Sequence, residues 1–176
     1  MKRRIAPEAI SAARWSGRDL VRAFAAILAL GVIAAWFLSR DAETIAGGGR
    51  AVDGDSLFVG GVEIRLAGIA APELRQSCEA GGKAYRCGEE ARRALAEILA
   101  GGPVTCRAQG RDRYGRRIAR CSAGGEDLGA ALVAEGWAIP MDGEYSGEEA
   151  RARRARLGLW AGTFEPPASF RRANPR

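Results

Sequence analysis

The chain has 176 residues, of which 27 are Lys or Arg and 21 are Asp or Glu, giving a formal net charge of +6. Its content of 47% hydrophobic and 27% charged residues is typical of a folded domain rather than a disordered chain. Histidine is absent from the sequence, which excludes a histidine general base, a Ser-His-Asp or Cys-His pair and a His-ligated zinc. Any hydrolysis must therefore use carboxylates, arginines, hydroxyls, water or a hard metal ion. The basic residues are nearly all arginine, which suits phosphate-bearing partners, although genomic base composition accounts for the same bias equally well.

The first 46 residues combine a basic segment with an apolar run. Residues 1–22 contain six Lys or Arg but only two acidic residues, and residues 23–39 contain no charge. A run of 17 residues is at the short end for a transmembrane helix, which needs about 17 to 25, and is longer than a signal-peptide core of about 7 to 15. We therefore predict a cytoplasmic basic segment and an uncleaved transmembrane signal-anchor at about 23–39. A cleaved signal peptide and a buried helix of the following domain are the alternatives.

Residues 47–165 are predicted to form one domain, followed by a basic tail at 166–176. The order is five short strands, with one helix between the third and fourth strands and further helices after the fifth. This order predicts an α+β, mainly β fold, a small five-stranded β-barrel of the OB type with about three helices. The strands are expected at 50–52, 56–59, 62–67, 104–109 and 118–122, and the helices at 88–101, 128–135 and 146–156.

Four cysteines, all after the apolar run, agree with export of this domain. An even number in an exported domain predicts two disulfides, for which three pairings are open. We favour Cys78–Cys87, which bracket one loop, and Cys106–Cys121, which flank RDRYGR at matching distances and suit two facing strands of a hairpin. Four free buried thiols are the alternative. The expected location is the periplasmic side of a bacterial inner membrane, with the N-terminal helix in the membrane, or the outside if the helix is cleaved.

Three charged clusters are candidates for chemistry. Asp53 and Asp55 flank a glycine where a strand ends, as hard-cation ligands do, although an Asx-turn has the same pattern. Arg65 and Glu73 enclose an apolar stretch, RLAGIAAPE, which by itself is a strand and a turn. Residues 111–117, RDRYGRR, carry four arginines around a Tyr-Gly turn, which suits an anion-binding loop or a solvated hairpin tip.

Taken in order, these clusters resemble the motifs of the staphylococcal-nuclease-like (thermonuclease) family. The resemblance covers about Ala51 to Trp160, and it depends on the linked order of the motifs because no single motif is specific. The matching segments are VDGDS at 52–56, RLAGIAAPE at 65–73, DRYGR at 112–116, ALVAEG at 131–136 and LGLW at 157–160.

The resemblance implies a role for each matching residue. Asp55 is similar to a calcium ligand of the family, and Arg65 to the arginine that binds the scissile phosphate. Glu73 is similar to the carboxylate that activates or orients the attacking water, and Arg116 to a second phosphate-binding arginine. These roles make Arg65, Glu73 and Arg116 the expected catalytic residues. The neighbouring residues expected to contact the substrate are Arg113, Tyr114 and Arg117, and Asp112 is similar to an acidic residue of the same loop.

Two departures from the family pattern bear on the expected site. The family usually has an aspartate where this chain has Ala70, so Asp55 is left as the only clear side-chain anion for Ca²⁺. Because calcium affinity depends on ligand charge, we expect binding weakened by roughly tenfold or more. Ala71 matters less, since the family's metal contact there is a backbone carbonyl. The family also often has tyrosines after Gly136, where this chain offers only Tyr145.

Two function classes follow from these residues. The first is a membrane-anchored, calcium-dependent nuclease, expected to be a monomer without protein partners, that cuts DNA, RNA or both. The second is a non-catalytic OB-type module that binds nucleic acid or another polyanion through arginines of the site. A structural envelope protein is a third class, but it gives no reason for two arginines and a glutamate at the matching positions. Glu73 favours the nuclease, because a carboxylate repels phosphate unless it serves water or metal.

Overall fold

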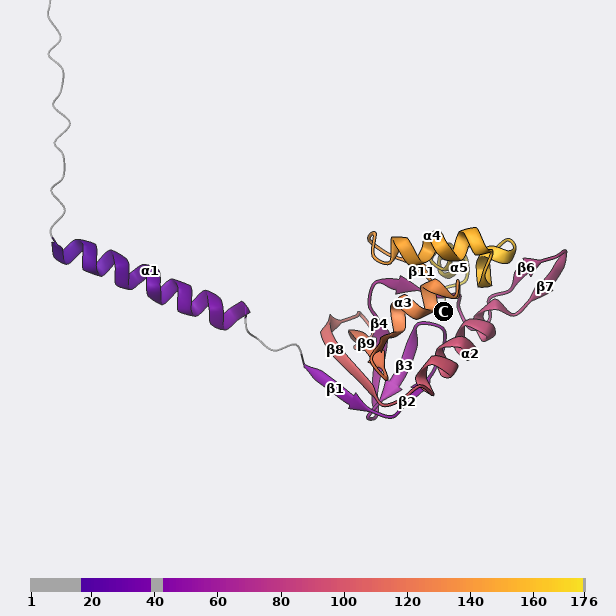
Figure 1. The fold of residues 1–176 in the computed structure, drawn as a ribbon, viewed down its shortest axis with the longest axis horizontal. Helices are drawn as coiled ribbons and strands as arrows, with labels where there is room; N and C mark the ends of the chain where they lie inside the picture. Colours follow the sequence, from indigo (N-terminus) through magenta and orange to yellow (C-terminus); the bar gives the residue numbers. More distant parts are fainter. Residues whose placement is uncertain (1–16, 39–42, 176) are drawn as a thin grey trace, which may run out of the picture. The chain divides into compact units, whose positions relative to one another are not determined.

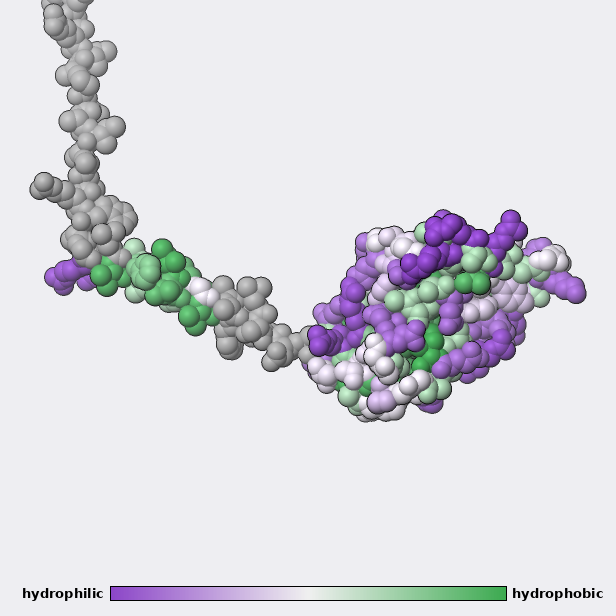
Figure 2. All heavy atoms as spheres, in the orientation of Figure 1, coloured by the Kyte–Doolittle hydropathy of each residue, from purple (hydrophilic) through white to green (hydrophobic). Residues whose placement is uncertain are grey.

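A computed structural model describes residues 17–38 and 43–175 of the chain, which divides into two units, Met1–Asp41 and Ala42–Arg176. The first unit contains helix α1, Gly17–Leu38 (Figure 1). Its side chains from Val21 to Ile33 are largely exposed and mostly hydrophobic (Figure 2).

A helix is thus confirmed over most of the predicted anchor, whose last residue, Ser39, lies outside the described residues. The helix begins earlier than predicted and takes in the charged residues Arg18 and Arg22. Among the residues that the structure describes, no helix has both the length and the apolar character needed to cross a membrane. The predicted transmembrane span is therefore not supported. The basic segment predicted before it lies mainly in residues 1–16, outside the described part.

The described part of the second unit is built on a seven-stranded, mainly antiparallel sheet. Its order is β1-β8-β9-β4-β3-β2, with β10 paired to β9, and only β4 and β9 run parallel among these described strands. Two small two-stranded ladders join β5 to β11 and β6 to β7, and the β6–β7 hairpin projects from the unit (Figure 1). The strands are β1 Thr44–Gly47, β2 Gly49–Ala51, β3 Ser56–Val59, β4 Val62–Leu66, β5 Ile69–Ala70, β6 Cys78–Ala80, β7 Lys83–Tyr85, β8 Val104–Arg111, β9 Arg117–Ala123, β10 Glu126–Asp127 and β11 Ile139–Pro140.

The expected closed five-stranded barrel is not observed. The strands at the two ends of this order, β1 and β2, are consecutive segments separated by Gly48. In the described residues, no ladder of hydrogen bonds pairs these two strands with each other. All five predicted strand regions are present, and the architecture is a mixed α+β fold with a mainly antiparallel sheet.

Three helices of the second unit agree with the predicted ones to within about two residues, and the described residues contain two more, a 3-10 helix and a short C-terminal helix. Helix α2 buries Ala91, Leu95 and Leu99, which recur every four residues and so lie on one face. Helix α3 is capped by Asp127, whose Oδ1 accepts a hydrogen bond of 2.8 Å from the Ala130 N–H. The segment predicted as a basic tail contains helix α5. The bounds are α2 Cys87–Leu99, α3 Leu128–Ala134, α4 Ser146–Ala155, the 3-10 helix η1 Gly158–Ala161 and α5 Pro167–Ala173.

The hydrophobic core lies between the sheet and helices α2 and α3. Leu57 and Ile64 from the sheet are fully buried with Leu95 of α2 and Leu132 of α3. Burial of each such side chain stabilises the fold by about 1.5–3 kcal/mol. This core fixes the sheet on which the candidate site is built.

Both favoured disulfides are present. Cys106 and Cys121 are directly opposed in the β8–β9 register and bonded within the core, and Cys78–Cys87 ties β6 to the start of α2. No cysteine of the described chain is free. Two disulfides indicate an oxidising, extracytoplasmic environment.

Candidate active site

Asp55 is the buried centre of the site. It is 4% exposed and lies at the end of the turn before β3, where the Asp53 carboxylate accepts a hydrogen bond of 3.0 Å from the Asp55 N–H. Asp55 Oδ1 accepts from Arg65 Nη1 at 2.9 Å and from Ser56 Oγ at 3.2 Å, and its Oδ2 accepts from the Ala71 N–H at 3.1 Å. Burial raises the pKa of Asp55 to about 6, although the Arg65 charge and the Ala71 N–H oppose the increase.

The β3–β4 hairpin places Arg65 beside this carboxylate. Gly60 and Gly61 form the turn with positive φ values of 55° and 83°, a conformation that glycine adopts without strain. The resulting register pairs Ser56 with Arg65, so the arginine side chain reaches back to the residue before Ser56. The Arg65–Asp55 pair is mostly buried, and such an arginine keeps a fixed direction.

Arg116 is directed into the same site by Asp112. Asp112 Oδ2 accepts from Arg116 Nε at 2.8 Å, and its Oδ1 accepts from the N–H groups of Tyr114 and Arg116 at 2.9 and 3.0 Å. Burial works to raise the pKa of Asp112, but the hydrogen bonds from Arg116 and Tyr114 lower it overall. Arg116 Nη1 then donates to Ser56 Oγ at 3.3 Å. Ser56 therefore connects Arg116 to Asp55 and Arg65.

Glu73 enters the site from the loop after β5. Its N–H donates to Gln76 Oε1 at 3.2 Å, and Glu73 Oε1 accepts from Arg171 Nη1 at 3.0 Å. The Glu73 charge also contributes to the raised pKa of Asp55, so the two carboxylates are close enough to repel each other. Because the Ala71 N–H binds Asp55, the loop that carries Glu73 is held against the carboxylate at the centre of the site.

The structure thus links Arg65 and Arg116, two of the residues predicted to be catalytic, through Asp55 and Ser56, and places the third, Glu73, on the loop bonded to Asp55. The predicted substrate contacts lie beside Arg116. Tyr114 is 68% exposed at the tip of the β8–β9 connection, with Arg113 4.8 Å from its ring centroid. Arg117 pairs with Glu43. Tyr114, Arg116 and Arg117 help to line an open hollow of about 390 Å³. Tyr145, by contrast, donates to Asp127 Oδ1 at 3.1 Å and belongs to the packing behind the site.

The side chains of the site do not supply the ligand set that Ca²⁺ requires, which is about six to eight oxygens with several carboxylates. Both Asp55 oxygens already accept hydrogen bonds, one of them from a guanidinium. Ala70 is buried and offers no side-chain oxygen. Within the described residues, no group of three or more His, Cys, Asp or Glu is placed to hold a metal ion. Arg65 lies where its positive charge balances Asp55.

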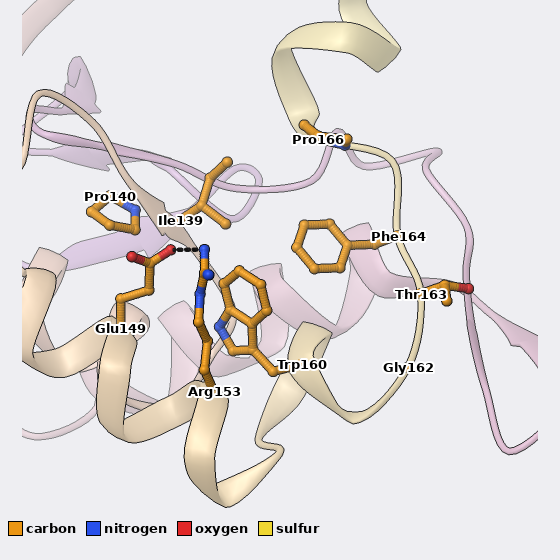
Figure 3. Close-up of a pocket in the computed structure, with 9 residues that line it drawn as sticks. All are labelled: Ile139, Pro140, Glu149, Arg153, Trp160, Gly162, Thr163, Phe164 and Pro166. Carbon is orange, nitrogen blue, oxygen red and sulfur yellow. Dashed lines mark hydrogen bonds and ion pairs between the residues drawn. The ribbon is translucent and has the colours of Figure 1, made fainter.

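A second hollow, of about 590 Å³, lies between α4, η1 and the C-terminal segment (Figure 3). Arg153 lies 4.1 Å from the centroid of the Trp160 ring and donates to Glu149 at 2.8 Å. The Trp160 and Phe164 rings pack edge to face at 5.1 Å. No residue predicted for catalysis or substrate binding lines this hollow. Its paired side chains join α4 to the segment that leads to α5.

Sequence reasoning missed three residues of the site. Ser56, the final residue of VDGDS, had a signal, because it precedes a strand and directly follows Asp55. Gln76 and Arg171 had none, since one lies in an irregular loop and the other in a segment predicted as a tail.

The structure is that of an α+β protein in which two arginines are directed to one place, and comparison with known proteins shows the family to which it belongs. A family model described as "Staphylococcal nuclease homologue" matches residues 63–162, and the chain belongs to this family. It is 36% identical over 139 residues to the "Succinoglycan biosynthesis protein ExoI" of Rhizobium meliloti (strain 1021), covering 73% of each chain. It is 34% identical over 146 residues to "Micrococcal nuclease" of Shigella flexneri, covering 71% of this chain and 79% of the relative. "Protein ParB" of Escherichia coli is 30% identical over 162 residues, covering 81% and 84%.

Proposed function

We propose that the chain is a phosphodiesterase of the nuclease type that hydrolyses DNA, RNA or both. The observation that carries the proposal is the hydrogen-bond network Arg65–Asp55–Ser56–Arg116, which aims two guanidinium groups at one place. Guanidinium forks match the oxygens of a phosphate, and two of them oppose the charge that grows on it during hydrolysis. Similarity to a relative named as a nuclease supports the same activity.

In this proposal Arg65 and Arg116 bind the non-bridging oxygens of the scissile phosphate. Asp55 and Asp112 hold the two arginines in their directions, so little reorganisation is needed when the substrate binds. Glu73 accepts the proton of the attacking water or orients it, because a carboxylate is the general base available to a chain without histidine. Arg113, Tyr114 and Arg117 would contact the neighbouring phosphates and bases.

Of the expected mechanism, the calcium requirement is the part that the side chains of the site support least. The staphylococcal nuclease family is typically calcium-dependent, whereas in this chain Arg65 is the cation that faces Asp55. The roles assigned to the two arginines and Glu73 do not need a metal ion. The proposed roles of these residues therefore do not depend on calcium, and the test varies its concentration.

The test uses full-length protein with both disulfides formed, incubated with single- and double-stranded DNA and RNA. Calcium is varied over a wide range, with a chelator control. We expect cleavage that falls by about 10²–10⁴-fold on Glu73→Gln. Glu97→Gln is the matched control, because Glu97 is an exposed residue of α2 remote from the network. Tight, salt-sensitive binding without cleavage at any calcium concentration would overturn the nuclease proposal.

The second candidate function is a non-catalytic module that binds nucleic acid or another polyanion. One observation favours it: each of the three central groups already has an oppositely charged partner, as binding sites without chemistry also do. The similarity to a protein named for succinoglycan biosynthesis also allows a process other than nucleic acid cleavage. Cleavage that is lost on Glu73→Gln excludes this candidate.

A further inference from the structure

The C-terminal segment crosses the loop that carries Glu73 and is bonded to it at three points. The backbones of Glu79 and Thr163 exchange hydrogen bonds of 3.0 and 2.8 Å. Gln76 Nε2 donates to the Glu165 carbonyl at 2.6 Å. Arg171 Nη1 donates to Glu73 Oε1 at 3.0 Å. Thr163, Glu165 and Arg171 all follow residue 162, where the match to the family model ends.

Close packing holds the C-terminal segment against the loop that carries Glu73. Gln76 is fully buried and bridges the two segments, since its Oε1 accepts from the Glu73 N–H while its Nε2 binds Glu165. Gly88 at the start of α2 leaves no room for a Cβ beside the Glu73 carbonyl, and Gly162 leaves none beside the Glu79 carbonyl. The Cys78–Cys87 disulfide ties β6, which follows this loop, to the start of α2. The backbone at Glu73 is therefore held, and the direction of its carboxylate depends on side-chain contacts such as the one from Arg171.

The charge at Glu73 needs compensation if the site is to bind a phosphate. Glu73 and Asp55 already repel each other, and a polyanionic substrate adds more negative charge. Arg65 and Arg116 are each bonded to their own aspartate. Arg171 is a positive group in contact with Glu73, and it reaches the site from α5.

We propose that Arg171 is a positioning residue of the active site, which holds the Glu73 carboxylate in direction and offsets its charge beside the anionic substrate. The inference deepens the proposed function and rests on the same site. The side chains of Arg171 and Glu73 are 37% and 18% exposed, so their ion pair contributes little to the stability of the fold. Its loss should change catalysis and substrate binding much more than unfolding. A purely structural contact would behave in the opposite way.

The experiment compares Arg171→Gln and Arg171→Lys in the full-length oxidised protein. Arg172→Gln is the matched control, because Arg172 is the next residue of the same helix and donates to Ser169. The readouts are kcat and KM on an oligonucleotide, the Kd of a non-hydrolysable phosphorothioate oligonucleotide at low salt, and the midpoint of thermal unfolding. Each Arg171 variant is also made in a Glu73→Gln background.

For Arg171→Gln we expect kcat to fall by about 10²-fold and the Kd to rise by roughly threefold to tenfold, with little change in the unfolding midpoint. Arg171→Lys should restore the Kd more than kcat, because lysine keeps the charge but not the planar fork. In the Glu73→Gln background, the effect of Arg171→Gln on kcat should vanish, because no carboxylate is left for Arg171 to orient.

Three results would overturn the inference. The first is that Arg171→Gln matches Arg172→Gln in kcat and Kd. The second is that its effect on kcat persists when residue 73 is glutamine. The third is that Arg171→Gln unfolds while Arg171→Lys shows wild-type kcat, since charge alone would then suffice. If the wild type binds the oligonucleotide but cleaves nothing, the proposed hydrolysis fails, and the Kd of Arg171→Gln compared with that of Arg172→Gln still decides whether Arg171 offsets charge beside the substrate.

Discussion

Arg65 and Arg116 are held by residues near them in the sequence or across one hairpin, whereas Glu73 is held by a residue 98 positions away. Asp112 lies four residues from Arg116, inside a single turn. Arg65 meets Asp55 through a two-glycine turn. The two sides of the site therefore depend on different structures. Each arginine is oriented within its own hairpin and the β4–β9 pairing brings the two hairpins together, whereas the Glu73 side also requires the C-terminal segment to fold back onto the domain.

The largest expected effect comes from replacing Arg65 on the arginine side of the site. Arg65→Gln removes the guanidinium that faces both Asp55 and the expected phosphate, and we expect kcat to fall by about 10²–10³-fold. Asp55 would remain buried without its partner, so the unfolding free energy should fall too, by about 3–5 kcal/mol. Cleavage assays and denaturant unfolding measure the two effects. Retention of more than a tenth of the wild-type kcat would remove Arg65 from the proposed mechanism.

Ala70→Asp adds a carboxylate between the arginine side and the Glu73 side of the site. We expect the wild type to show no saturable calcium binding in the millimolar range by calorimetry, because the described side chains do not form a ligand cluster. The variant should bind calcium at least about tenfold more tightly. Without calcium it should be less stable, because position 70 is buried and the new charge has no partner there. Equal calcium binding by both proteins would show that position 70 is not the missing ligand.

Asp112→Asn tests how far the arginine side depends on its local turn. The amide keeps one acceptor oxygen, so the turn N–H groups stay bound while the charge that directs Arg116 is lost. We expect kcat/KM to fall by about tenfold, an effect smaller than that of losing Arg65. Asp142→Asn is the control, because Asp142 lies in the connection after β11 with a positive φ that asparagine tolerates. An equal change in kcat/KM in both variants would mean that net charge alone is acting.

The difference between local and long-range contacts also explains which parts of the structure could be predicted from the sequence. The hairpin at Gly60–Gly61, the periodic apolar face of α2 and the order of DGDS and DRYGR are local patterns, and each predicted its structure. The pairing of Cys106 with Cys121 followed from a hairpin as well. Helix α5 was missed because its short segment looks like a charged tail, and its partners are set by tertiary packing. The arrangement of the sheet was not predicted correctly, because strand patterns indicate where strands lie but not how the ends of a sheet pair.

The smallest expected effect concerns Tyr145, which packs behind the stretch that connects the two sides. Its ring approaches Gly68, midway between Arg65 and Glu73, and its hydroxyl donates to Asp127. Burial, with the negative charge of Asp127 next, raises the pKa of Tyr145 from 10.0 to about 12. The folded state thus favours the neutral phenol.

The raised pKa of Tyr145 determines how the stability of the fold changes at high pH. The contribution of Tyr145 to stability is fully present below pH 10.0 and is lost as the pH rises toward about 12, because the unfolded chain ionises first. In a phenolate absorbance titration we expect one late step, which Tyr145→Phe removes. Cleavage measured near neutral pH should change less than about twofold in that variant, because Tyr145 supports the packing without facing the site. A large loss of cleavage with an unchanged unfolding midpoint would instead place Tyr145 with the substrate contacts, where tyrosines of related proteins were expected.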